Sequence, residues 1–62
     1  MNDKKIYDLK LSKKKINAAM ALIEEAQNLL EDFPEVEPSH LADALEELDT
    51  QYWKICNLLN LL

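Results

Sequence analysis

Apolar residues recur at steps of three and four along the last third of the chain, residues 39–62. The positions concerned are Leu41, Ala44, Leu45, Leu48, Tyr52, Ile55, Leu58, Leu59 and Leu62. This spacing is the period of an α-helix that buries one face. The pattern therefore predicts one long amphipathic helix, and the upstream residues are expected to supply the surface against which it packs.

A second helix is predicted over residues 12–32, because another set of apolar residues follows the same period. Its members are Ile16, Ala19, Ile23, Ala26, Leu30 and Phe33, in which large residues alternate with alanine. Met20, Leu22 and Leu29 widen this stripe, as is expected for a helix of a bundle. The alanines would let a neighbouring helix approach closely.

Residues 1–11 fit two interpretations. Tyr7, Leu9 and Leu11 alternate with polar residues as in a strand, whereas other spacings in the segment fit a helix. Ser12 is a suitable N-cap, although three lysines would then stand in the first turn, against the helix dipole. A helix that starts near Asp3 avoids this. We prefer an extended or short helical N-terminal arm over residues 1–11, with the alternative start left open.

The connection is predicted over residues 33–38, because Pro34 and Pro38 disfavour helical geometry at the residues before them. Ser39 can cap the following helix, and Phe33 and Val36 are expected to cover the end of the core. A short connection makes the helices antiparallel neighbours. The predicted fold is an all-α antiparallel helical hairpin about 30 Å long, in which the arm could form a third element and which could dimerise into a bundle.

Two helices of this size cannot cover all the apolar side chains. A 62-residue chain with one cysteine has no internal disulfide to support it. Either the N-terminal arm or another chain should therefore cover the surplus. On the last helix the residues off the centre of the main stripe are Trp53, Cys56 and Leu61. We expect these three, together with Tyr52, to form a contact surface for a partner or a second copy.

Charge is strongly segregated along the chain. Residues 1–15 hold six lysines and two aspartates, a net charge of +4, while residues 16–62 hold ten acids and Lys54 alone, a net charge of −9. Three explanations compete: a solvated surface, an antiparallel homodimer that pairs opposite ends, or an acidic surface that binds a basic protein by imitating nucleic-acid phosphates. The acids expected to contact a partner are Glu31, Asp32, Glu35 and Glu37.

The residues that usually carry catalysis or cofactor binding do not occur in combination. Glycine is absent, and His40 and Cys56 are single and about 24 Å apart on one helix. We therefore expect no catalytic, metal or cofactor site and no small-molecule substrate. The chain carries no apolar run long enough to cross a membrane, so we expect a soluble, cytoplasmic protein.

The sequence thus predicts a small acidic protein–protein interaction module, such as a phage- or plasmid-type inhibitor or adaptor that binds a basic protein. One alternative is a hairpin dimer that binds nucleic acid through its lysine-rich arm. A net charge of −5 argues against that alternative. A second alternative is a purely structural subunit of a larger assembly.

Overall fold

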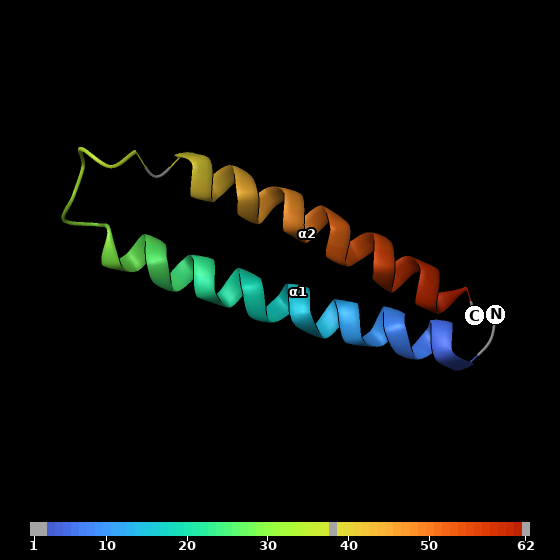
Figure 1. Ribbon diagram of the computed structural model, residues 1–62. Helices are drawn as coiled ribbons and strands as arrows, with labels where there is room; N and C mark the ends of the chain where they lie inside the picture. Colours follow the sequence, from blue (N-terminus) through green and yellow to red (C-terminus); the bar gives the residue numbers. More distant parts are fainter. Residues whose placement is uncertain (1–2, 38, 62) are drawn as a thin grey trace.

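A computed structural model describes residues 3–37 and 39–61, and within them it shows two helices that form an antiparallel hairpin (Figure 1). Helix α1 spans Asp3–Leu29 and helix α2 spans Ser39–Asn60. The two helices lie side by side, and the start of α1 and the end of α2 lie at the same end of the molecule. The all-helical hairpin class is therefore confirmed. The molecule measures 48 × 14 × 11 Å, longer than expected because α1 has 27 residues.

Helix α1 begins at Asp3, nine residues before the preferred start at Ser12. The start near Asp3 is the one that the structure adopts, and it places a carboxylate in the first turn, where the helix dipole favours negative charge. Ile6 and Leu9 are half-buried and continue the spacing of the residues that face α2. Residues 3–11 of the predicted arm are thus part of α1 and do not fold back over the hairpin, while residues 1–2 lie outside the described part of the chain.

The faces by which the two helices meet can be followed from their half-buried positions. We call these positions the inner face of each helix. On α1 the inner face comprises Ile6, Leu9, Lys13, Ile16, Ala19, Met20, Ile23, Ala26 and Gln27, continued by Leu30 just beyond the helix. On α2 it comprises Leu41, Ala44, Leu45, Leu48, Tyr52, Ile55, Cys56 and Leu59. From Leu41 to Leu59 the α2 face matches its predicted stripe with two differences: Leu58 is exposed, and Cys56, expected off the centre of the stripe, joins the inner face. The last predicted position, Leu62, lies outside the described residues.

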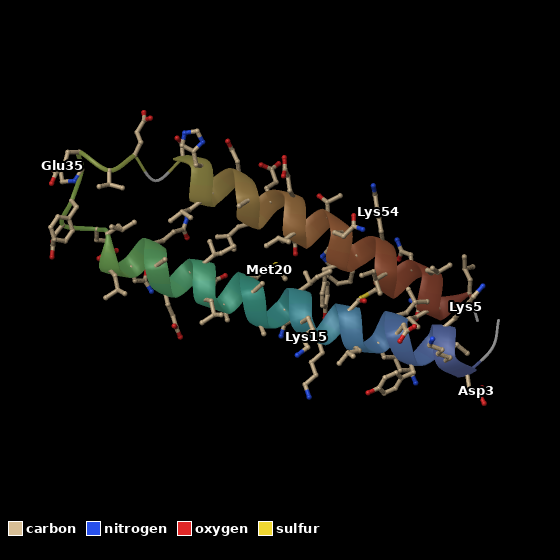
Figure 2. All side chains as sticks on the ribbon, in the orientation of Figure 1. Asp3, Lys5, Lys15, Met20, Glu35 and Lys54 are labelled. Atoms are coloured by element: carbon tan, nitrogen blue, oxygen red, sulfur yellow. The ribbon has the colours of Figure 1, made fainter. Side chains whose placement is uncertain are left out.

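The predicted seam of α1 lies on the inner face from Ile16 to Leu30, but two of the residues expected to widen it do not. Met20 and Gln27 join the alanines on the inner face, and Figure 2 shows Met20 directed toward α2. By contrast, Leu22 and Leu29 are 64% and 77% exposed, so they do not widen the buried side. The expectation that they do so is wrong because they lie roughly 100° or more around the helix from its inner face.

The interior of the hairpin is thin. Ile55 is the one buried side chain among the described residues, at 9% exposure, and the other inner-face residues are half-buried. Next to it, the ammonium group of Lys13 on α1 lies 5.5 Å from the centre of the Tyr52 ring on α2. Two helices packed along one seam leave their remaining circumference to solvent. The surfaces of the molecule therefore matter more than its core.

Candidate protein-interaction site

The connection between the helices is built from consecutive tight turns. The Leu30 N–H donates to both Ala26 O and Gln27 O at 3.1 Å, so the end of α1 tightens toward 3₁₀ geometry. The Phe33 N–H then donates to Leu30 O at 3.0 Å, and the Val36 N–H donates to Phe33 O at 3.0 Å. No described residue has a positive φ. Since the chain lacks glycine, it reverses direction through these turns. Pro34 is the second residue of the turn that the Val36–Phe33 bond closes, a position that suits the fixed φ of proline.

These turns expose a cluster that we call the acidic tip, residues 31–37. All seven of its side chains are exposed. Its carboxylates belong to the four predicted contact residues, Glu31, Asp32, Glu35 and Glu37. Phe33 and Val36 stand among them at 50% and 47% exposure, so the expectation that they cover the end of the core is wrong. Backbone bonding through the successive turns holds both side chains at the end of the molecule instead.

The other predicted contact residues lie along α2. Trp53 is 57% exposed, and its ring meets the Tyr52 ring edge-on, with centroids 5.6 Å apart and an interplanar angle of 89°. Tyr52 itself is half-buried on the inner face, under Lys13. Cys56 is a free, half-buried thiol, also on the inner face. Leu61 follows the end of α2 in a turn and is 82% exposed.

The predicted contact residues therefore do not form one surface. Trp53 lies fourteen residues from the start of α2, which places it about 21 Å from the acidic tip at 1.5 Å per residue. Leu61 lies farther still, near the opposite end of the molecule. Only the acidic tip brings several of the predicted residues together with exposed apolar side chains. It is the stronger candidate site.

The fold converts the segregation of charge along the chain into segregation in space. Residues 3–15 of α1 lie beside the last turns of α2, so one end of the hairpin gathers seven lysines and two aspartates. The half of the hairpin that contains the acidic tip, residues 16–49, carries ten acids and no lysine. One end of the 48 Å molecule thus has a net charge of +5 and the other −10. An approaching basic surface would be steered to the acidic tip.

The lysines of α1 do not share one face. At roughly 100° per residue, Lys13, Lys14 and Lys15 point in three different directions. Lys13 lies over the Tyr52 ring, whereas Figure 2 shows Lys15 directed away from α2. A nucleic-acid site that follows a phosphate backbone needs its cations along one groove or stripe. The arrangement weighs against the lysine-arm alternative.

A shallow open depression lies at the basic end of the hairpin. Its volume is about 260 Å³, and its lining residues are Lys5, Asp8, Leu9, Ser12 and Leu58. No sequence pattern predicts this depression, because its residues come from both helices and are brought together only by the antiparallel packing. It is too open to exclude water from a reaction, and Asp8 is its one carboxylate.

Neither described helix has the length and apolar character that a membrane crossing requires. Across residues 3–37 and 39–61, no three His, Cys, Asp or Glu side chains come together as a metal site would need. No protein-family model, curated protein sequence or solved structure shows a significant match to this chain. The residues of the hairpin are therefore the whole basis for a functional proposal.

Proposed function

We propose that this protein is a small, non-enzymatic interaction module that binds a basic surface of another protein through its acidic tip. The observation that supports the proposal is the composition of the tip, where two half-exposed apolar side chains, Phe33 and Val36, stand among four exposed carboxylates. A partner with lysines or arginines around an apolar depression would complement it. Apolar contact supplies affinity, and charge supplies orientation and a fast association rate.

An inhibitor or adaptor role follows from the same surface. Carboxylates held at the end of a helical hairpin present negative charge much as a phosphate backbone does, so a protein that binds nucleic acid is a suitable partner class. The tip has no cation of its own to compensate its charge, because the chain contains no lysine or arginine between Lys15 and Lys54. A locally repulsive cluster without an internal counter-charge is a feature typical of binding sites.

The test is affinity purification from cells of the source organism with three forms of the protein. In the tip variant, the four carboxylates are neutralised by Glu31→Gln, Asp32→Asn, Glu35→Gln and Glu37→Gln. A matched control removes the same charge from exposed positions on the helices by Glu24→Gln, Asp43→Asn, Glu46→Gln and Glu47→Gln. We expect the wild type and the control to retain a basic partner that the tip variant loses.

Two further measurements sharpen the result. Replacing both apolar residues of the tip with serine (F33S and V36S) should weaken capture while the carboxylates remain, and high salt should weaken capture by the wild type. Circular dichroism must show that every variant keeps its helix content. Capture of the same partner by the tip variant, at wild-type strength, would refute the proposal.

A further inference from the structure

A second apolar surface runs along α1 on the side away from α2. We call it the outer stripe, and its members are Tyr7, Leu11, Ala18, Leu22 and Leu29. At 100° per residue these five positions fall within a sector of roughly 60°, centred about 160° around the helix from the inner face. All five are exposed, and Leu29 reaches 77%. The stripe extends over most of α1, and α2 leaves it uncovered.

The accessible surface of the hairpin is larger than that of a compact monomer of its mass. The hairpin exposes 5120 Å², whereas a compact monomer of its mass exposes about 4,100 Å². Its radius of gyration is 14.8 Å, against about 10.6 Å for a compact 62-residue domain. Large exposed apolar stripes on small proteins mark interfaces. The surplus surface is consistent with a protein that buries more in an assembly than it does alone.

The residue pattern of the outer stripe complements itself when two copies of α1 run antiparallel. Aligned about a two-fold axis near residue 20, Leu11 faces Leu29 of a second copy and Ala18 faces Leu22, since each pair of residue numbers adds up to 40. Ala18 leaves room at the centre for the two helices to approach closely. Every apolar contact then occurs twice, as a two-fold interface requires.

The charges beside the stripe match the same register. Lys14 and Glu25, whose numbers add up to 39, lie on the same edge of the stripe, roughly 20° apart around the helix. In the antiparallel arrangement Lys14 of each copy therefore faces Glu25 of the other. In a parallel, in-register arrangement Lys14 of one copy and Glu25 of the other would lie eleven residues, or about 16 Å, apart along the helix axis and could not pair. The charges favour the antiparallel arrangement.

We propose that two copies of this chain form an antiparallel dimer through their outer stripes, with α1 packed against α1. The stripe offers roughly 500 Å² of exposed surface on each copy, or about 1,000 Å² in the pair, which meets the lower bound for a specific interface. The register also lays the acidic tip of one copy beside the basic end of the other, which brings together the oppositely charged ends of two molecules.

The first test is the oligomeric state, measured by sedimentation equilibrium of the full chain over a range of concentrations. We expect a dimer, and a dissociation constant at least about tenfold higher for the double variant L22Q and L29Q, which removes two apolar contacts per copy. The matched control is W53Q with L61Q, two exposed apolar residues of α2 that lie off the stripe. The proposal would be overturned if the wild type were monomeric, or if W53Q with L61Q dissociated the dimer while L22Q with L29Q did not.

The second test is a charge exchange. K14E or E25K alone should weaken the dimer, and the two together should restore it, because the exchanged charges attract again across the interface. Within one chain the two residues are eleven positions and about 16 Å apart, so restoration cannot come from a contact inside the helix. A double variant weaker than both single variants would rule out this register.

The dimer and the binding of a partner by the acidic tip can fail separately. The L22Q and L29Q variant keeps all four tip carboxylates, and the tip variant keeps the whole outer stripe. Loss of the dimer with retained partner capture would leave the proposed function standing. Loss of capture in the tip variant, with the dimer intact by sedimentation, would show that the tip has a role beyond self-association.

Discussion

Replacing Ile55 with alanine is the sharpest test of how the hairpin is held together. Ile55 is the one buried side chain of the described residues, and it lies one turn from Tyr52, which contacts α1 through Lys13. A buried isoleucine truncated to alanine costs about 2–5 kcal/mol. Because the site lies in a thin interface that can partly close, we expect a value near the lower end, about 2–3 kcal/mol.

This loss is large relative to the whole molecule. A domain of this length has a free energy of unfolding of about 3–9 kcal/mol, so the I55A variant should lose at least about a fifth of it. The assay is urea unfolding followed by circular dichroism, at one protein concentration because association also stabilises the folded state. The control is L61A, which removes a side chain that is 82% exposed and should change the free energy of unfolding by less than about 0.5 kcal/mol.

The result that would refute the reasoning is a similar effect of both substitutions. If I55A and L61A cost the same, the seam between the inner faces would not be the main source of stability, and the contacts of the exposed surfaces would have to supply it. If I55A changed the slope of the free energy of unfolding against urea concentration, the substitution would have altered the compactness of the native or the denatured state.

Three further outcomes follow from contacts described above. K13Q should lower the free energy of unfolding by about 0.5–1 kcal/mol, because it removes the contact of the ammonium group with the Tyr52 ring. The same substitution should cost less in a Y52L protein, which has no ring at this position, than in a Y52F protein, which keeps one. P34A should lower the free energy of unfolding by about 0.4–1 kcal/mol, because the unfolded chain gains conformational freedom at the connection; an unchanged urea midpoint would contradict this. Trp53 is 57% exposed, so acrylamide should readily quench its fluorescence. The quenching should be the same at low and high protein concentration, because the proposed dimer forms through α1. Protection of Trp53 at high concentration would place the interface on α2.

The sequence predicted the hairpin and the start of α2 well, because the three-and-four spacing of α2 is strong and Ser39 follows a proline. It misplaced the start of α1. The strand-like alternation of Tyr7, Leu9 and Leu11 and the suitability of Ser12 as an N-cap suggested a start at Ser12. The dipole cost of three lysines in its first turn, about 0.3–1 kcal/mol each, argued for the earlier start. In the structure Ile6 and Leu9 are half-buried, and the packing gained by continuing α1 back to Asp3 outweighs any preference for a break at Ser12.

The outer stripe could not be separated from the inner face by sequence alone. Apolar residues occur on both sides of α1, and their periodicity does not say which side meets the partner helix. The predicted seam was correct from Ile16 to Leu30, but Leu22 and Leu29 were counted with Met20 as its margin because they are apolar, whereas the polar Gln27 concealed one true inner position. The contents of the acidic tip were predicted, but the exposure of Phe33 depends on hydrogen bonds of successive turns that composition does not reveal.

Pro34 has a consequence for how this chain can associate. Helical hairpins often exchange partners by straightening their connection, so that each chain becomes one long rod and lends a helix to its neighbour. A proline in the middle of such a rod would clash with the preceding turn and remove a hydrogen bond, at a cost of about 3 kcal/mol. That penalty is comparable to the stability of the protein itself, so copies of this chain should meet as closed hairpins rather than as interlocked rods.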